Sequence, residues 1–507
     1  MQTMSSGDFS SWTPEPRAGV VAVIGGGISG LAAARRLVDT VPRVDVHVLE
    51  AGERAGGVLG TVRDRGFLIE ESADSFLTAT PHAVDLCRRV GLEGEVIPTD
   101  PSHRRAFVVS EGRLVPLPDG LMVMAPTRLW PMVTTPILGP FSKLRMGMEL
   151  LVGRSDLADE SLAGFARRRF GKGAYERLIQ PLVGGMYTGD PERLSAEATM
   201  PRFREMERNH GSLIRASLRE RAERARRERD TTGAGPADGT AGKAAGSGAR
   251  YGMFAGLRDG MGSLVEATIR SLPPNAVRCG AAVRGLARLP GGGWRVSVAD
   301  SGDFLADAVV VATAARDAAR LLTGIDPDLG AELGRIRSTS CAIVSLAYSR
   351  DQIEHRLDGF GFVVPEVEKL QVLSATFSSV KFAGRAPADM VLLRAFLGGA
   401  FRAATLDRPD PEIIATAAAE LGRLLGIRGE PSLTRIRRWP GVMPQYELGH
   451  IDLVRSIEDR IRAIPGLALA GNAYHGVGVP QCIKSGEEAA ETIAEYLSGV
   501  EKAASGT

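Results

Sequence analysis

The sequence lacks the features of several functional classes. Its 507 residues carry a formal net charge of only +2, and a balance this close to neutral gives no sign of nucleic-acid binding. No two of the four cysteines, Cys87, Cys279, Cys341 and Cys482, have a metal-ligand or CxxC spacing. We therefore expect no metal site, and reduced thiols as in a cytoplasmic protein. Cys482 alone stands close to a candidate cofactor loop.

Long apolar runs are also missing. The stretch closest to a membrane span, residues 121–141, is interrupted by Arg128 and four prolines, whereas a span needs roughly 18–20 uncharged apolar residues. This stretch is either a surface loop, lining an apolar channel or touching a membrane superficially, or core packing in a second domain. The sequence leaves both interpretations open. Residues 1–17 are polar, so we expect a disordered tail over residues 1–18 and no signal peptide.

The length and composition are those of a globular protein with two or three domains. Apolar residues make up 44% of the chain and charged residues 24%, which is typical of soluble proteins. Residues 203–229 are dense in Arg and Glu with i,i+4 pairs such as Glu220 and Arg224, which predicts one long exposed helix. Residues 231–250 are rich in Gly, Ala and Thr, which predicts a flexible insertion.

The strongest pattern lies between Val20 and Glu50. An apolar strand leads into Gly25-Gly26-Gly27-Ile28-Ser29-Gly30, then a helical stretch, then a second apolar strand ending at Glu50. This is a βαβ unit with a dinucleotide fingerprint. Gly25 permits the tight turn, Gly27 lets the backbone approach a pyrophosphate, and Gly30 lets the helix lie close to the sheet. Glu50 is placed to accept hydrogen bonds from ribose hydroxyls, and its charge disfavours a 2′-phosphate.

A second glycine pair follows this unit. The chain continues Ala51-Gly52-Glu53-Arg54-Ala55-Gly56-Gly57-Val58, in which Arg54 can neutralise a diphosphate and the glycines allow close backbone contact. The arrangement resembles the second fingerprint of the two-dinucleotide-binding-domain flavoproteins, which include amine oxidases, phytoene desaturases and porphyrinogen oxidases. The resemblance implies FAD, because nicotinamide enzymes have no need of this loop. The alternative interpretation is a surface loop between strands.

A third candidate segment lies near the end of the chain. A short apolar strand over 467–471 precedes the turn 472–483, which contains Val477, Gly478 and Val479, and a helical run over 484–497. Strand, glycine-rich turn and helix start together favour an anion site. In the resembling flavoproteins this helix start faces the flavin pyrimidine edge. An ordinary strand–turn–helix is the alternative.

The remaining patterns predict a second sheet and a nucleotide domain assembled from separate segments. Residues 277–283, 294–298 and 308–312 are predicted as strands that return to the nucleotide domain. Residues 340–348, 361–365, 370–377 and 390–398 predict the sheet of a substrate domain, followed by a helix over 411–425 and a returning strand over 435–439. Phe107–Val109 and Arg113–Leu117 predict a hairpin around Glu111-Gly112.

Nearly the whole chain resembles the oxygen-dependent porphyrinogen oxidases of haem biosynthesis. The matching segments are 70–76, 117–121, 202–207, 375–379, 444–450 and, most specifically, 476–483. The resemblance implies an α/β fold (α+β overall), with a Rossmann-like FAD-binding domain interleaved with a mixed-sheet substrate domain and a helical segment. We expect the FAD-binding domain over 19–85, 251–315 and 432–507, the substrate-binding domain over 86–118 and 316–431, and a helical, membrane-facing segment over 119–230.

The same resemblance implies the activity and the partners. It implies FAD-dependent oxidation of coproporphyrinogen III or, as the alternative, protoporphyrinogen IX, with O2 as acceptor and H2O2 as product. Hydride from a methylene bridge goes to the flavin while a pyrrole nitrogen loses its proton, so we name no catalytic side chain. A ferrochelatase is the implied receiver of the product. The rival hypotheses are an amine oxidase or desaturase and a non-catalytic FAD- or porphyrin-binding protein.

The residues expected at the site follow from the motifs and the resemblance. Those expected at FAD are Gly25, Gly26, Gly27, Ile28, Ser29, Gly30, Glu50, Ala51, Arg54, Gly57, Val58, Ser72, Ala73, Asp74, Ser75, Val283, Trp439, Val477, Gly478 and Val479. Trp439 packs either on the flavin or in the core. The resemblance implies that Leu346 and Phe396 line the substrate pocket. Met122 stands where some relatives have arginine, so the candidate cations for the propionates are Arg128, Arg104, Lys143 and Arg177.

Overall fold

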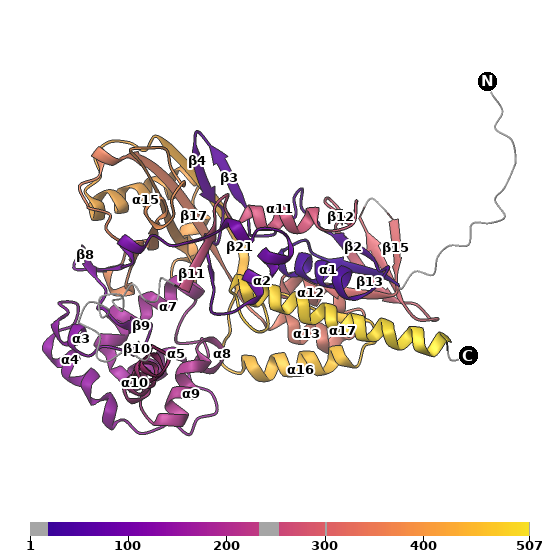
Figure 1. Cartoon of the computed structure of the whole chain (residues 1–507), viewed down its shortest axis with the longest axis horizontal. Coiled ribbons are helices and arrows are strands. Elements are labelled where there is room, and N and C mark those ends of the chain that lie inside the picture. Colours follow the sequence, from indigo (N-terminus) through magenta and orange to yellow (C-terminus); the bar gives the residue numbers. More distant parts are fainter. Residues whose placement is uncertain (1–18, 233–252, 300–301, 506–507) are drawn as a thin grey trace, which may run out of the picture.

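The structure, a computed structural model, describes residues 19–232, 253–299 and 302–505 (Figure 1). The predicted tail lies outside the described residues, and only the first two residues of the predicted insertion are described, as the end of a helix. Two large sheets, one at each end of the long axis, and a group of helices below one of them make up the molecule (Figure 1). The predicted mixed α/β fold with interleaved segments is confirmed.

A parallel five-stranded sheet forms the nucleotide-binding half. Its order is β12 (Val277–Arg278), β2 (Asp45–Leu49), β1 (Val20–Ile24), β16 (Ala308–Val311) and β22 (Leu467–Leu469). Alternate side chains point to opposite faces. Val21 and Val23 pack under α1 (Ile28–Thr40), α17 (Val479–Ser505), α11 (Gly262–Arg270) and α2 (His82–Arg89). Ala22 and Ile24 pack under α12 (Ala315–Leu322), α13 (Pro327–Gly334) and α16 (His450–Arg462).

A mixed seven-stranded sheet forms the second half. Its order is β21 (Leu433–Pro444), β17 (Ser338–Ser349), β20 (Met390–Gly398), β19 (Val372–Phe377), β18 (Gly361–Val363), β7 (Phe107–Ser110) and β8 (Arg113–Pro116). The hairpin predicted around Glu111-Gly112 is the β7–β8 pair, and both turn residues have positive φ. Helix α15 (Asp410–Leu425) covers one face of the sheet with Ile413, Ala417 and Leu421. The β21 strand belongs to this sheet, although we placed 432–507 in the FAD-binding part.

The described residues also form smaller sheets. The pairs are β3 (Thr61–Asp64) with β4 (Phe67–Glu70), and β9 (Leu121–Met122) with β10 (Ala125–Pro126). Three-stranded sheets join β5 (Phe76–Leu77), β11 (Phe254–Leu257) and β6 (Val96–Pro98), and β13 (Val283–Arg288), β14 (Trp294–Val298) and β15 (Gly302–Ala306). Short helix α14 is Ser378–Lys381. Turns of 3₁₀ helix lie at Glu93–Glu95, Pro101–His103, Met148–Leu151, Arg350–Gln352, Glu366–Glu368 and Ala403–Asp407.

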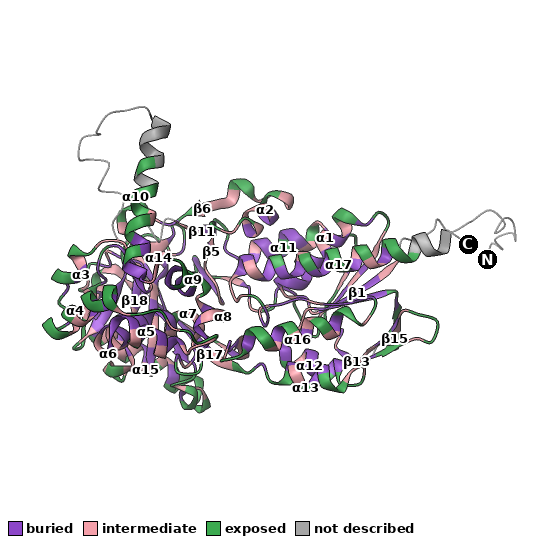
Figure 2. Cartoon of the chain, turned by 90° about the horizontal axis from the view of Figure 1, so that it is seen from below, coloured by how far each residue is buried: buried purple, intermediate pink, exposed green. Residues whose placement is uncertain are grey.

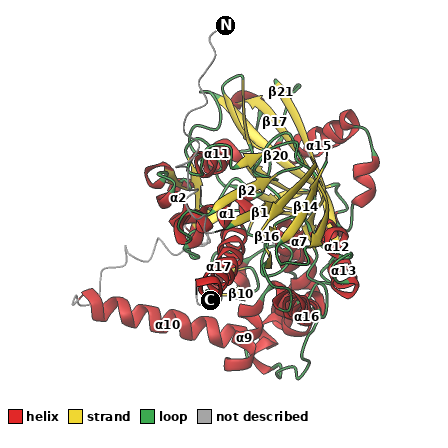
Figure 3. Ribbon diagram, turned by 90° about the vertical axis from the view of Figure 1, so that its right-hand side faces the viewer, coloured by secondary structure: helices red, strands yellow, loops and turns green. Residues whose placement is uncertain are grey.

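The helical part has its own apolar core, and its outer surface is exposed (Figure 2). Its helices are α3 (Trp130–Thr134), α4 (Pro140–Gly147), α5 (Leu162–Phe170), α6 (Lys172–Ala174), a π-helical turn at Tyr175–Ile179, α7 (Gln180–Tyr187), α8 (Ala196–Thr199), α9 (Pro201–His210) and α10 (Leu213–Thr232). Helix α10 extends away from the body of the molecule (Figure 3). Within the 121–141 stretch, Met124, Met132 and Leu138 are buried, as core packing requires, while Trp130 and Phe141 are exposed. The channel lining or membrane contact considered for this stretch stays a prediction.

Two element predictions are wrong. The single exposed helix over 203–229 is broken between α9 and α10, because Gly211 adopts a φ of +72° that ends the first helix. Its first turns are also buried, with Phe203, Arg204 and Glu207 inside the fold. The strand over 277–283 is two strands, β12 and β13, separated at Gly280, which has a φ of +72°.

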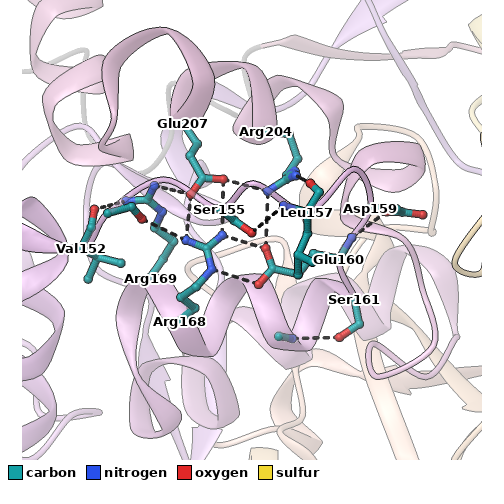
Figure 4. A network of polar contacts seen from close by, with 12 residues as sticks. Val152, Ser155, Leu157, Asp159, Glu160, Ser161, Arg168, Arg169, Arg204 and Glu207 are labelled. Carbon is teal, nitrogen blue, oxygen red and sulfur yellow. Dashed lines mark hydrogen bonds and ion pairs between the residues drawn. The ribbon is translucent and has the colours of Figure 1, made fainter.

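A buried ion network fastens α9 to α5 (Figure 4). Arg168 donates to Glu160 at 2.7 Å and to Glu207 at 2.8 Å. Arg204 donates to Glu207 at 2.8 Å, and the fully buried Arg169 also contacts Glu207. Each buried charge has an opposite charge beside it, which is the condition under which burial is tolerated. The 202–207 motif therefore has a structural role at a distance from the candidate cofactor loops.

Candidate functional site

The loop after β1 leaves the N-terminus of α1 open. A Cβ on Gly25 would lie 2.5 Å from the Ala312 oxygen, and one on Gly30 would lie 2.0 Å from the Gly25 oxygen. A Cβ on Gly27 would meet nothing within 4 Å. Gly27 is the N-cap of α1, and among the described residues no side chain caps this helix. The first N–H groups of α1 are thus available to an anion, which is the requirement of a pyrophosphate site.

Glu50 is fixed beside this loop by backbone donors. Its two carboxylate oxygens accept hydrogen bonds from Gly26 N–H and Gly52 N–H, each at 2.7 Å. Ala281 N–H donates to the Glu50 carbonyl at 2.8 Å, which brings the start of β13, at Val283, close to the carboxylate. An oriented carboxylate next to a helix N-terminus suits a ribose adjoining a pyrophosphate.

The second glycine pair lies directly against the first loop. Gly56 N–H donates to the Gly26 carbonyl at 2.7 Å, and a Cβ on Gly57 would lie 3.2 Å from Gly27 Cα. Arg54 donates to the Leu59 carbonyl at 2.8 Å and to Glu71 at 2.9 Å, with 42% of its side chain exposed. Arg54 therefore braces the loop from within, and its predicted diphosphate contact stays a prediction.

The third loop reaches the same place from the other end of the chain. Helices α1 and α17 cross so closely that a Cβ on Gly486 would lie 2.1 Å from the Ser29 carbonyl oxygen. Helix α17 begins at Val479, five residues before the predicted run at 484, so its N-terminus adjoins that of α1. Burial raises the pKa of Cys482 to about 12. Its thiol is therefore not a reactive thiolate.

Tyr446 holds this third loop in position. Its buried hydroxyl donates to the Asn472 carbonyl at 2.5 Å and accepts from Gly476 N–H at 2.8 Å. Its ring stacks on His450 at 4.1 Å. Burial lowers the pKa of His450 to about 4, so this imidazole is neutral at physiological pH. Sequence analysis placed both residues in a matched segment without assigning either a role.

The loop from Glu71 to Phe76 is held by the seven-stranded sheet. The Trp439 indole N–H donates to the Glu71 carbonyl at 2.7 Å, and Arg394 donates to the Ser72 carbonyl. Lys381 donates to Asp74 at 2.6 Å and to Ser75 at 2.9 Å. Burial alone would raise the pKa of Asp74, but Lys381 and Arg394 outweigh it and lower that pKa to about 2. Asp74 is therefore a permanent anion between two cations.

A cavity of about 240 Å³ opens beside this loop. It lies between α7, which contributes Leu182, Gly185 and Met186, and strands β18 and β19, which contribute Phe362, Ser374 and Thr376. Of the described residues that line it, Lys381 alone is charged. A mostly apolar cavity with a few polar groups is the usual form of a small-molecule site.

The predicted substrate residues fall in different places. Phe396 lies on the face of β20 that carries Arg394, whose guanidinium is 5.3 Å from the phenyl ring. Leu346 is fully buried on the opposite face, in the core under α15, so its predicted pocket position is wrong. The two pair with different residues, Leu346 with Leu393 and Phe396 with Ile343. The described lining of the cavity includes none of the four predicted cations, Arg104, Arg128, Lys143 and Arg177.

Sequence analysis missed two cations that contact the Glu71–Phe76 loop, Lys381 and Arg394. The sequence contains a pattern that could have identified Arg394, because a charged residue in the middle of the apolar strand 390–398 needs a buried partner of opposite charge. No sequence pattern identifies Lys381, since a lysine after a helical turn is ordinarily exposed to solvent. Its partner Asp74 is 307 residues away in the sequence.

Comparison with known proteins identifies the family. Residues 28–494 match the family described as flavin containing amine oxidoreductase. The chain belongs to this flavoprotein family. It is 36% identical to the coproporphyrinogen III oxidase of Propionibacterium freudenreichii subsp. freudenreichii, an alignment that covers 93% of this chain and 90% of the relative. It is 30% identical to the Staphylococcus aureus coproporphyrinogen III oxidase, over 94% of this chain and 99% of the relative.

Solved structures of flavoproteins share its fold. A protein from Exiguobacterium sp. 255-15, described as a candidate protoporphyrinogen oxidase, superposes with a TM-score of 0.80 at 29% identity, covering 94% of this chain and 98% of the other. A putrescine oxidase superposes with a TM-score of 0.67 at 17% identity, over 94% and 99%, and shows the fold alone. This chain is accordingly a flavin-dependent oxidase, with FAD as its cofactor. The open N-terminus of α1 and the free space at the Cβ position of Gly27 fit that cofactor.

Proposed function

We propose that this flavoprotein oxidises coproporphyrinogen III to coproporphyrin III in haem biosynthesis, with O2 as acceptor and H2O2 as product. The observation that carries the proposal is the end-to-end similarity to coproporphyrinogen III oxidases at 30–36% identity. The mostly apolar cavity beside the Glu71–Phe76 loop suits a tetrapyrrole edge. The product is a free porphyrin, so we propose a ferrochelatase as its receiver.

We propose that FAD lies across the three converging loops. The α1 N-terminus and Gly27 would hold the pyrophosphate, Glu50 the ribose, and the α17 N-terminus the pyrimidine edge. FAD held there would supply the redox chemistry, accepting one hydride from a methylene bridge in each of three two-electron oxidations, with O2 as the final acceptor. Asp74 and Lys381 are paired with each other. Because they are paired, we assign neither of them a role in proton transfer. The described residues bind and orient the substrate, and the proton lost in each oxidation step comes from a pyrrole nitrogen of the substrate.

Direct assay of the two porphyrinogens tests the proposal. The purified protein should consume O2, release H2O2 and generate a Soret band with coproporphyrinogen III. Protoporphyrinogen IX is the second candidate, because the chain is also 28% identical to Arabidopsis thaliana protoporphyrinogen oxidase 2 over 94% of both chains. A higher kcat/KM for protoporphyrinogen IX would reverse the substrate assignment. Absence of turnover with both would contradict the proposal, and turnover of an amine would support the rival class.

We propose a cytoplasmic location with a peripheral membrane contact through the helical part. Within the described residues no helix is long and apolar enough to cross a bilayer. Helices α3 and α4 lie at the end of the molecule farthest from β15 (Figures 1 and 2). They and the following turn expose Leu129, Trp130, Val133, Phe141, Leu144, Met148, Leu150 and Leu151, with exposed fractions reaching 88% at Phe141. A group of exposed apolar side chains on neighbouring helices is typical of an interfacial surface.

Vesicle binding tests this contact. Vesicles of phosphatidylcholine with anionic lipid should cosediment the protein and shift the fluorescence of Trp130. Replacement of Trp130, Phe141 and Leu151 by Ser should abolish cosedimentation. The matched control is Leu305→Ser, which removes an exposed apolar side chain at the opposite end of the molecule. Equal binding by the triple variant and the control would contradict the contact.

A further inference from the structure

We propose that Lys381 is a specificity-determining residue that binds a carboxylate of the substrate inside the cavity between α7, β18 and β19. The inference rests on the proposed function and adds the residue that selects a substrate rich in propionates. Lys381 ends α14 and follows β19 by four residues, so the strand and the short helix fix its backbone at the cavity wall.

Lys381 is held rigidly but keeps hydrogen-bonding capacity. Its side chain is 13% exposed, and its ammonium lies 5.3 Å from the Phe382 ring and 5.8 Å from the Phe254 ring. An ammonium group has three donors. Two of them go to Asp74 and Ser75, and among the described residues the third has no hydrogen-bond partner, which leaves it for a ligand. A donor immobilised in this way loses little conformational entropy when a ligand binds.

The ion cluster around Lys381 carries a net positive charge, and Lys381 is its member in the described lining of the cavity. Asp74 is shared between Lys381, at 2.6 Å, and Arg394, at 3.6 Å. One carboxylate therefore neutralises only one of two cations. The next pair along, Glu70 and Arg385 at 3.9 Å, contributes no net charge. A carboxylate entering this largely buried place meets an uncompensated positive charge, and such interactions are strong where water is scarce.

The cavity wall also supplies hydroxyl donors for a carboxylate. Ser374 and Thr376 are two residues apart on β19 and line the cavity together with Lys381. Residues two apart on a strand point to the same face of the sheet. An ammonium and two hydroxyls on one wall match the acceptor-rich end of a propionate. The opposite wall, with Leu182 and Met186, is apolar and suits the pyrrole ring.

This position predicts discrimination between the two porphyrinogens. Coproporphyrinogen III carries four propionates and protoporphyrinogen IX carries two, with vinyl groups replacing the others. Any edge of the first substrate offers a carboxylate to Lys381, whereas a vinyl edge of the second offers none. Loss of the lysine charge should therefore weaken coproporphyrinogen binding more than protoporphyrinogen binding.

The test compares Lys381→Gln with the wild-type holoenzyme. Glutamine keeps a donor for Asp74 but removes the charge. Loss of one charge-assisted hydrogen bond should raise the KM for coproporphyrinogen III roughly tenfold to a hundredfold, with a smaller rise for protoporphyrinogen IX and little change in kcat. Lys381→Arg should recover part of the loss. The control is Lys172→Met, a lysine with 79% of its side chain exposed.

A binding measurement separates a charge effect from a structural one. Coproporphyrin III should bind the glutamine variant about tenfold or more weakly than wild type by fluorescence titration. Its uncharged tetramethyl ester should bind both proteins equally. Equal losses for acid and ester, lost FAD absorbance, or unchanged binding of the acid would each overturn the inference. Failure of the proposed function is distinguishable, because wild type would then turn over neither porphyrinogen.

Discussion

At the residue scale, one buried hydroxyl helps to hold the third candidate cofactor loop in position. The Tyr446 hydroxyl bonds both the Asn472 carbonyl and the Gly476 N–H, two residues before Gly478. We predict that Tyr446→Phe raises the Kd for FAD about tenfold, because each lost hydrogen bond costs about 1 kcal/mol and leaves a buried group unpaired. FAD titration of the apoprotein measures this.

Tyr187→Phe is the matched control for that experiment. The Tyr187 ring packs near Tyr446 at 6.4 Å, but its hydroxyl donates to the Thr199 carbonyl, away from the cofactor loops. The control should bind FAD like wild type. Equal FAD affinities of the two variants would mean that Tyr446 does not position the loop.

The lowered pKa of His450 predicts how the free energy of unfolding depends on pH. Burial, opposed by the Tyr474 carbonyl, lowers its pKa to about 4 from an ordinary 6.5. The unfolded chain therefore binds the proton first, and the free energy of unfolding falls as the pH drops from about 6.5 towards 4. His450→Phe keeps a stacking ring without a titrating group, so it should flatten this part of the curve. Denaturant unfolding at several pH values checks the slope, and an unchanged slope in the variant would contradict the assignment.

At the element scale, the fingerprint glycines serve different purposes, and two alanine variants separate them. Gly27 has φ −67° and an open Cβ position, so Gly27→Ala should leave the apoprotein as stable as wild type. It should weaken FAD binding tenfold or more, because the methyl group fills the pyrophosphate cradle. Gly30→Ala should destabilise the apoprotein itself by roughly 1–3 kcal/mol, since its Cβ collides with the Gly25 carbonyl.

Thermal unfolding of the apoproteins and FAD titration distinguish the two effects. If Gly27→Ala lowered the melting temperature of the apoprotein as much as Gly30→Ala, the separation of roles would fail. Full FAD affinity in Gly27→Ala would likewise place the pyrophosphate elsewhere.

Elements with strong local signals came out of the sequence as predicted. The β1–α1–β2 unit, the β7–β8 hairpin and β20 all match, because apolar periodicity and turn glycines fix them locally. The prediction of a single helix over 203–229 was wrong because it relied on a composition, dense in Arg and Glu, that is typical of a solvent-exposed helix. In the structure Glu149, from a distant 3₁₀ turn, accepts the Leu213 N–H at 2.9 Å and caps α10. A cap that comes from 64 residues away has no signature in the helix sequence.

At the scale of the whole molecule, bound FAD should stabilise the fold, because it would contact three segments that are far apart in the sequence. The α1 loop, the Gly56-Gly57 loop and the α17 N-terminus meet at one place. We predict that removing FAD lowers the melting temperature by roughly 2–3 °C, since a ligand at one hundred times its Kd contributes about 2.7 kcal/mol and a chain of this length unfolds with an entropy of about 1 kcal/mol/K. FMN, which lacks the adenylate, should restore less of the loss. Identical melting temperatures of apo- and holoprotein would exclude this stabilisation by FAD.

The sequence by itself determined the nucleotide-binding unit, the cofactor and the family. Those properties depend on short motifs whose glycines and periodicity act within about thirty residues, as in the βαβ unit. Only the tertiary structure decided which charges meet beside the cavity between α7, β18 and β19. Lys381, Arg394 and Asp74 come from separate strands and loops, and burial rather than spacing pairs them. Leu346 lies on the face of the sheet opposite to Phe396. The alternation within a strand shows which residues share a face, but it does not show which of the two faces points towards the cavity.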